Sequence, residues 1–575
     1  MRLPERLRRR PAAPVPALRV PRAAWLWIAP LALLIGAVVY AVARWLLTGL
    51  PPNPAGPDEV AARNEAVRTA LTAGAGVGAA VTVMLAFRRQ RHQELAAHLT
   101  TALADRNATL AERTAEATQH DATERRVTEL YIKAVEQLGS DKAAVRLGGL
   151  YALERLAQDN RSQRQTIVNV ICAYLRMPYT LPALPDPDQV RKQALRDARR
   201  RYYATRTARH APTPRPAAPS TPVQDAEGER QVRLTAQRIL ADHLRDDRPI
   251  DQRHELPPPT RFWDNTSVDL TGATLINFDF RNCHTTEAQF ERVAFSGDVT
   301  FSGAIFSGDA TFDGASFSGD ATFDGAIFTG VAWFDEASFS AVAGFNRTSF
   351  SGDATFNEAT FSGVAWFDEA SFSRDTWFDG AIFSGVTTFN EATFSRDATF
   401  TEASFSRDAT FTKASFSRDA MFNVASFSGA GFNLAIFSGD AMFTKASFSG
   451  DATFNGASFG GAGFNGASFF GDATFTGAAF AGDAWFNKAS FVENVWFSEA
   501  TFSRDAGFTR ASFSGDARFD RATFDTEVDV TDATVRDPAR PHIWPPDWHV
   551  QILADGTGLL TRVTDPQQAE PAEAG

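Results

Sequence analysis

Phenylalanine recurs with a strict period through the second half of this chain. From Phe301 to Phe524 it returns at alternating steps of five and six residues, and an alanine stands two residues before most copies. The unit reads A-x-F-x-x, with one additional residue in every second copy. A repeat this short and this regular indicates a solenoid, whose surface is structural unless some position departs from the repeat.

The charge of the chain is divided unevenly along its length. Residues 266–535 hold 35 Asp and Glu against 14 Lys and Arg, a net charge of −21, whereas the whole chain carries −11. The remainder is therefore +10, and an acidic rod is joined to a basic N-terminal half. Two cysteines, Cys172 and Cys283, fall on different predicted units. They predict neither a disulfide framework nor a thiolate metal site, which suits a reducing compartment.

Two apolar stretches near the N-terminus predict a membrane hairpin. Residues 23–43 and 69–87 contain no charged residue, and about 20 apolar residues cross a bilayer as a helix. Seven arginines precede the first stretch, and Arg88, Arg89 and Arg91 follow the second. The positive-inside rule then places both termini, and everything after the hairpin, in the cytoplasm. We therefore expect a multi-pass protein of the cell membrane, with the bilayer as one partner.

A cleaved signal peptide and a phosphate-binding loop are the two alternatives to a hairpin in this region. The sequence Ala41-Val42-Ala43 resembles a signal-peptide cleavage site, but the apolar stretch exceeds the usual length of about 7–15 residues. The glycines at 74, 76 and 78 lack the Lys-Ser/Thr of a phosphate-binding loop. Gly74 and Gly78 instead form a small-xxx-small pair, which favours close packing of the hairpin or of two hairpins in a dimer.

The segment after the hairpin reads as helical. Residues 88–126 predict a juxtamembrane helix, and three short amphipathic helices up to Pro178 predict a small bundle, either a packed spacer or a HEAT-like binder of helices. Residues 191–209 hold eight basic residues, which suit a solvated helix face or anionic lipid better than nucleic acid, which we do not expect as a partner. A proline-rich linker and one further amphipathic helix precede the repeats, where a solenoid requires a cap.

Together these patterns predict eight segments along the chain. They are a basic N-terminus (1–22), the hairpin (23–87), the juxtamembrane helix and bundle (88–178), a basic and Pro-rich linker (179–225), a helical cap (226–265), the repeats (266–535), a C-terminal cap hairpin (536–563) and a disordered tail (564–575).

The repeat pattern resembles that of pentapeptide-repeat proteins, and the order of hairpin, Glu129–Leu156 and repeats resembles their membrane-anchored members in actinobacteria. The resemblance implies a right-handed, four-sided parallel β-helix, mainly β in class, with Phe and the preceding Ala inside. Each Phe would then stack on another about 4.8 Å above and below it. The predicted core ladder begins with Phe301, Phe306, Phe312, Phe317, Phe323, Phe328, Phe334 and Phe339.

Three departures from the plain repeat are candidates for a role. The additional residue is usually Asp, as at Asp309, and we expect it to cap a turn rather than to hold calcium. Trp333, Trp377 and Trp485 fall on one outward face, and Trp366 and Trp496 on the opposite one. The first three are candidate partner contacts, although they could equally just cover the rod. Two copies, before Phe432 and Phe464, omit the additional residue, and we expect the rod to bend or twist there.

The sequence contains no pattern that predicts catalysis. We find no H-E-x-x-H, no G-x-S-x-G and no nucleophile–base pair, so we expect no enzyme and no catalytic, metal or cofactor residues. The leading hypothesis is a membrane-tethered scaffold for an unknown protein partner. Some pentapeptide-repeat proteins mimic B-form DNA and act on gyrase, so the resemblance and the charge of −21 make a DNA mimic the first alternative. A signalling protein is the second, although its outer loop is short for a sensor.

Overall fold

The protein is described by a computed structural model that covers residues 25–50, 52, 56–181, 196, 222–249, 252–253 and 255–562. The predicted N-terminal segment, nearly all of the basic and Pro-rich linker, and the predicted tail lie outside these residues. The chain divides into two units, Met1–Glu124 and Arg125–Gly575, which we describe separately.

The first unit contains two long helices, α1 (Trp25–Leu47) and most of α2 (Pro57–Leu138). Each is long and apolar enough over part of its length to cross a membrane, and α1 qualifies over Ala29–Leu47. The helices approach closely at Gly74, where an added Cβ would lie 2.8 Å from Cγ2 of Val39. The sequence suggested separate helices over 69–87, 88–126 and 128–138. That division is wrong, because neither Gly nor Pro interrupts residues 79–138 and the helix continues.

The second unit begins with a helical bundle. The end of α2 packs with α3 (Ala143–Asp159), the short helix η1 (Arg161–Gln163), α4 (Arg164–Arg176) and α6 (Pro222–Leu244). Gly149 permits the closest crossing, since a Cβ there would lie 2.7 Å from the carbonyl oxygen of Ala134 in α2. We expected α6 to be a separate cap. Instead it packs against α3 and α4 within one apolar core, because its apolar stripe and theirs face one another.

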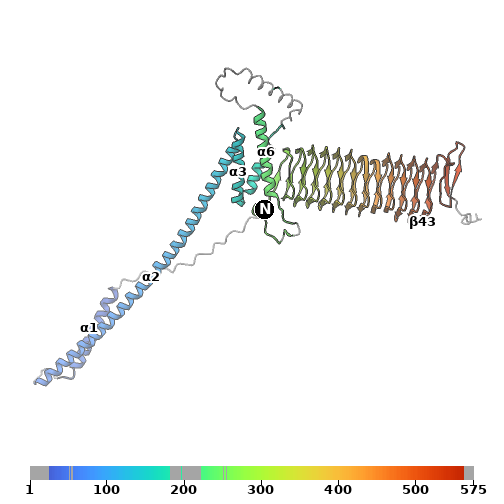
Figure 1. Cartoon of the computed structure of the whole chain (residues 1–575). Helices are drawn as coiled ribbons and strands as arrows, with labels where there is room; N and C mark the ends of the chain where they lie inside the picture. Colours follow the sequence, from blue (N-terminus) through green and yellow to red (C-terminus); the bar gives the residue numbers. More distant parts are fainter. Residues whose placement is uncertain are drawn as a thin grey trace, which may run out of the picture. The chain divides into compact units, whose positions relative to one another are not determined.

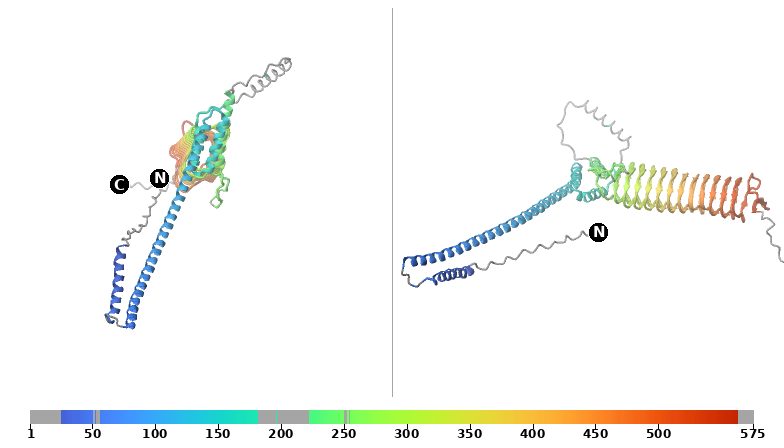
Figure 2. Two further views of the ribbon diagram at one scale, coloured as in Figure 1. Left: turned by 90° about the vertical axis from the view of Figure 1, so that its left-hand side faces the viewer. Right: turned by 90° about the horizontal axis from the view of Figure 1, so that it is seen from below.

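The bundle covers the open N-terminal end of the rod, as Figure 1 and Figure 2 show. Gln237 of α6 makes two hydrogen bonds with the backbone of Ile276, accepting from its N–H (3.0 Å) and donating to its C=O (2.8 Å). Arg176 of α4 pairs with Asp269. The cap is therefore the whole bundle rather than a helix over 226–265, and no α-helix occurs among the described residues of 245–265.

The rod is a parallel β-solenoid of about 12 turns, which confirms the predicted β-helix. One coil consists of β7 (Ile305–Phe306), β8 (Ala310–Thr311), β9 (Ser316–Phe317) and β10 (Ala321–Thr322). Each strand pairs in parallel with its equivalent 22 residues later, so β7 pairs with β11 (Ile327–Phe328). Strands of the β7 and β8 kind form a 23-stranded sheet, and those of the β9 and β10 kind form a 24-stranded sheet. The Phe and Ala side chains fill the space between the four sides.

The two coils that lack a residue do not interrupt the stack. At these places strand structure continues through the corner, in β28 (Ser426–Gly431) and β32 (Ser458–Gly463). The pairing register shifts by one residue between Phe405 and Asp408 and between Phe437 and Asp440. The missing residue is thus absorbed locally by a β-bulge in the neighbouring coil, and Figure 1 shows the coils continuing in line.

The last coil is covered at the C-terminal end of the rod. Strands β46 (Trp548–Ile552) and β47 (Gly558–Arg562) form an antiparallel hairpin, and β47 pairs with β45 (Thr534–Val535) of the rod. The ring of Trp548 lies 5.2 Å from that of Phe519. This arrangement hides the edge that a solenoid would otherwise present to other strands.

Candidate interaction surface

The phenylalanine ladder is a continuous stack of rings. Phe345 shows the pattern: its ring lies 4.7 Å from Phe323 and 4.8 Å from Phe367, with interplanar angles of 1° and 2°. It meets Phe334 and Phe356 edge-on at 5.5 and 5.6 Å. The eight ladder residues named above are all buried. Because the rings touch within and between coils, the core has no room for a ligand, and any site lies outside.

Several of the inserted Asp residues accept a hydrogen bond from the next coil rather than from their own turn. The backbone N–H of Val331 donates to Oδ1 of Asp309 (3.0 Å), and that of Asp440 donates to Oδ1 of Asp419 (3.0 Å). The partner is 21 or 22 residues away, so the predicted acceptor role is right and the predicted local turn is wrong. Among the described residues, no group of three or more His, Cys, Asp or Glu could hold a metal ion.

A second ladder of acceptors was missed by the sequence analysis. The residue directly after the Phe is often Asp or Asn, and its Oδ1 accepts the N–H of its equivalent on the next coil. Asp335 accepts from Asn357 (2.8 Å), and Asp368 accepts from Asn390 (2.8 Å). The sequence contains the pattern that could have predicted this ladder, because the position after the Phe is restricted to Asp, Asn, Thr and Ser over most of the rod.

The candidate contact residues Trp333, Trp377 and Trp485 lie on one side of the rod, in strands β12 (Ala332–Trp333), β20 (Thr376–Trp377) and β36 (Ala484–Trp485). All three are half-buried. Thr355 pairs with both Trp333 and Trp377, and its hydroxyl is buried without a hydrogen-bond partner. Each Trp ring thus packs in part against its neighbours on the adjacent coils, and the remainder of the ring is exposed. Met421 and Met442 occupy equivalent positions, and we call these five residues the tryptophan face.

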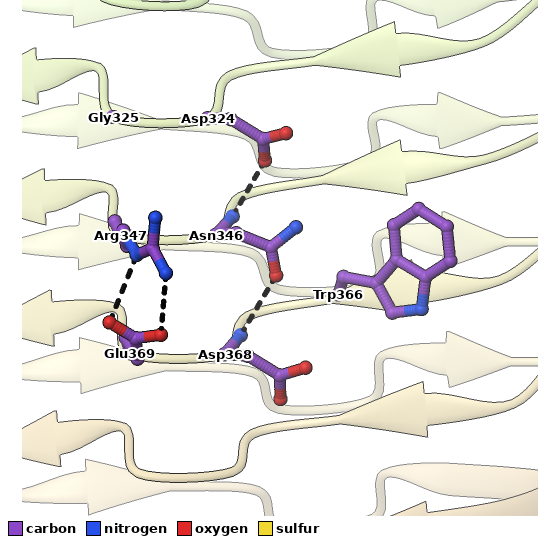
Figure 3. Close-up of a pocket in the computed structure, with 7 residues that line it drawn as sticks. All are labelled: Asp324, Gly325, Asn346, Arg347, Trp366, Asp368 and Glu369. Carbon is purple, nitrogen blue, oxygen red and sulfur yellow. Dashed lines mark hydrogen bonds and ion pairs between the residues drawn. The ribbon is translucent and has the colours of Figure 1, made fainter.

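The opposite side carries Trp366 beside a shallow depression of about 660 Å³ (Figure 3). Gly344 pairs with Trp366 on the neighbouring coil, and its missing side chain leaves the space open. Arg347 and Glu369 line the depression and form a two-pronged ion pair at 2.9 and 3.0 Å. This pair holds the pKa of the Glu369 carboxyl below its usual value, chiefly through the hydrogen bonds from Arg347. Arg347 and Glu369 therefore neutralise each other, while Asp324 and Asp368, which also line the depression, each accept one backbone N–H from the next coil.

Two corners of every coil contain a residue in the left-handed region, two positions after a Phe. One series runs along the corner beside the tryptophan face, and we call it the unpaired column. It consists of Glu336, Glu358, Gly380, Glu402, Val424, Lys445, Gly466, Lys488 and Arg510. The other series, the paired column, consists of Arg347, Glu369, Glu391, Lys413, Leu434, Gly456, Gly477, Glu499 and Arg521. All eighteen residues have φ between 55° and 67°.

The two columns differ in how their charges are satisfied. In the paired column, Arg347 bonds Glu369, Lys413 bonds Glu391 (2.9 Å) and Arg521 bonds Glu499 (2.7 Å). In the unpaired column only Arg510 has an ion-pair partner, Asp532 at 3.4 Å. Its other five charged residues are exposed and form no ion pair with any residue that the structure describes. These five charges are therefore held in fixed positions and are not neutralised by ion pairs within the described part of the rod.

The remaining predicted residues do not belong to this surface. Arg88, Arg89 and Arg91 lie exposed on α2, in the first unit. Both cysteines are buried, and burial raises the pKa of Cys172 to about 12 and also raises that of Cys283. Neither thiol is placed to act as a nucleophile.

Comparison with known proteins gives one match. The family model described as pentapeptide repeats (9 copies) matches residues 290–338, 301–349, 345–393, 378–426, 432–479, 464–512 and 497–540. The rod is thus built of pentapeptide repeats. No curated protein and no solved structure matches the chain.

Proposed function

We propose that this protein is a membrane-tethered scaffold whose pentapeptide-repeat rod presents a fixed surface to other proteins on the cytoplasmic face. The observation that carries the proposal is the tryptophan face with its adjoining unpaired column. Trp, Met and Arg are the residues enriched where proteins bind one another, and charges held in place by backbone geometry can select a partner.

The tether is supported by the two helices that are apolar enough to span a bilayer. Arg88, Arg89 and Arg91 follow the second apolar stretch, and the positive-inside rule then favours a cytoplasmic rod. The pentapeptide-repeat solenoid itself fits a structural or interaction role, because its sides are regular and its core is filled.

Proximity labelling from the intact anchored protein tests the proposal. We expect a reproducible set of labelled proteins that is lost when Trp333 and Trp377 are changed to Ala. The matched control changes Trp366 and Trp496, on the opposite side, and should keep the set. Identical labelling from all three proteins, or labelling of further copies of this chain alone, would contradict a scaffold that acts through this face.

A second candidate function rests on the charge of the rod. A net charge of −21 over residues 266–535 favours a mimic of B-form DNA that binds gyrase. The purified protein should then inhibit DNA supercoiling by gyrase at stoichiometric concentrations. Unchanged supercoiling at a large excess of protein eliminates this candidate and leaves the scaffold.

A further inference from the structure

The unpaired column has an internal order that the fold does not require. Its residues occupy nine successive coils, as shown by backbone bonds such as Glu336 N–H to Asn357 C=O and Lys488 N–H to Thr509 C=O, both to the next coil. Within these nine coils, all charges before Val424 are negative and all charges after it are positive. The same corner also carries Arg292 two coils before Glu336 and Asp532 one coil after Arg510, and these two residues lie outside this order. Two like-charge pairs, Glu336 with Glu358 and Lys488 with Arg510, lie on adjacent coils about 4.8 Å apart, which is unfavourable within one rod.

This order is symmetric about Val424 with the signs reversed. One coil away from Val424 stand Glu402 and Lys445, and two coils away stand Gly380 and Gly466. Three coils away stand Glu358 and Lys488, and four coils away stand Glu336 and Arg510. When a two-fold axis relates two antiparallel copies, each residue faces the residue that lies at the same distance on the other side of the axis. The column has opposite charges at such positions, so the two copies would be complementary in charge.

We propose that two copies of this chain pack side by side and antiparallel through the tryptophan face and the unpaired column, with the two-fold axis at Val424. Glu336, Glu358 and Glu402 of one copy then face Arg510, Lys488 and Lys445 of the other. The exposed Val424 meets its own equivalent on the axis. The interface contains each pair twice, so six ion pairs replace the like-charge stacking of the separate rods.

Side-chain size on the tryptophan face agrees with the same axis, independently of charge. The outward position paired after Trp485 is Gly507, and the one paired before it is Gly463. Met421 lies on the same coil as Val424. Trp377 and Gly463 are each two coils from Met421, and Trp333 and Gly507 are each four coils from it. The axis therefore brings each Trp opposite a Gly of the other copy. Each of these rings therefore faces a position without a side chain. Two large rings at the same level would instead hold the rods apart.

Comparison with the paired column indicates that the partner of the unpaired column is a second copy of this chain. The paired column satisfies its charges within the rod, and charged residues at equal distances from its centre at Leu434 have the same sign instead of opposite signs, as Arg347 and Arg521 do. A foreign partner would need no symmetry in the surface it binds, whereas a second copy does. The other edge of the tryptophan face carries Arg374, Arg396 and Arg418 beside Asp375, Asp397 and Asp419, so it adds no net charge on those coils.

Disulfide cross-linking of the full-length protein in detergent micelles tests this pairing. Val424→Cys places a thiol on the axis, and mild oxidation should convert most of the protein to a covalent dimer. Leu434→Cys is the matched control, because it has the same left-handed backbone (φ 58°) and nearly the same exposure, 52% against 51%. It lies on the paired column and should remain monomeric. The two natural cysteines are buried and add no background.

Charge reversal tests the antiparallel arrangement. In the Val424→Cys background, Lys488→Glu should reduce the rate of dimer formation on the order of tenfold, since two symmetric pairs become repulsive. Adding Glu358→Lys should restore it, because the swapped residues face each other again. Equal cross-linking at positions 424 and 434, or failure of the second change to restore the first, overturns the proposal. The pairing uses the surface on which the proposed scaffold function rests, so a confirmed dimer would leave that surface free for other proteins only in the separated copies. If cross-linking fails, the scaffold function is still judged by the labelled partners.

Discussion

At the scale of the residue, a ladder position such as Phe345 combines burial with ring contacts above, below and beside it. Replacing Phe345 by Ala should lower the free energy of unfolding by about 3–5 kcal/mol, because the cavity removes two stacked and three edge-on contacts. Urea denaturation followed by circular dichroism measures the change. Phe470 is exposed and serves as the control, since Phe470→Ala should change stability by less than about 0.5 kcal/mol. Equal effects at both positions would contradict the ladder.

The left-handed corners make a second prediction at this scale. Gly477 has φ of 67°, and nothing lies within 4 Å of a Cβ built there. Gly477→Val should therefore destabilise the rod by about 1–2 kcal/mol through the backbone alone, because a β-branched residue is strained in this region. Gly477→Asn should cost less, since Asn tolerates it. If the two variants are equally stable in urea, backbone strain is not what selects residues at this corner.

At the scale of the element, the junction of bundle and rod contains a carboxylate that titrates. Asp279 accepts hydrogen bonds from Arg281 and pairs with Arg245 at 3.4 Å, and the hydrogen bonds from Arg281 contribute most to lowering its pKa. The usual pKa of Asp is about 3.9, so this stabilisation is fully present above that pH and is lost as pH falls through the lower folded value.

We therefore expect Asp279→Asn to shift the urea midpoint downward at pH 7 and pH 5 by the same amount. The difference from the natural protein should shrink below about pH 4, where both chains lose the charge. Measurement at pH 7, 5 and 3 checks this. A difference that stays constant to pH 3 would show that the charge of Asp279 does not tie the bundle to the rod.

The elements were predictable to different degrees. The spacing of Phe predicted the strands of the rod, because each strand repeats the same short sequence pattern. The apolar stretches in α1 and α2 were evident from composition. The packing of α6 against α3 and α4 was not, because an amphipathic stripe such as Val232, Ile239 and Leu240 does not identify its partner. The order of charges in the unpaired column was present in the sequence. It became visible only once coils of 21 and 22 residues were aligned, because the two missing residues shift the count.

At the scale of the whole molecule, antiparallel pairing would place a helical bundle at each end of a double rod. Such an assembly presents two equivalent ends instead of one. Raising the salt concentration should weaken it, because the ion pairs are exposed and screened beyond about 10 Å at 0.1 M. The apparent mass of the detergent-solubilised protein, followed by light scattering between low and high salt, measures this. A dimer that is unchanged at 1 M salt would point to the membrane hairpin as its contact.

The buried thiols provide a tool at this scale. Cys172 and Cys283 should not react with a maleimide at pH 7 while the protein is folded, since both are buried and their pKa values are raised. Both should react in denaturant. Rapid reaction of the folded protein would show that the bundle opens readily. Because the natural cysteines do not react, any labelling of a folded variant comes from the introduced cysteine and shows on which side of the membrane that cysteine lies.

Accessibility of such a cysteine in intact cells tests the membrane-tethered cytoplasmic rod most directly. Gly49→Cys lies between α1 and α2, and Leu434→Cys is exposed on the rod. With a membrane-impermeant maleimide, we predict labelling of Gly49→Cys in intact cells and of Leu434→Cys only after the membrane is permeabilised. Labelling of Leu434→Cys in intact cells would contradict a cytoplasmic rod, and recovery of either variant in the soluble fraction would contradict the tether.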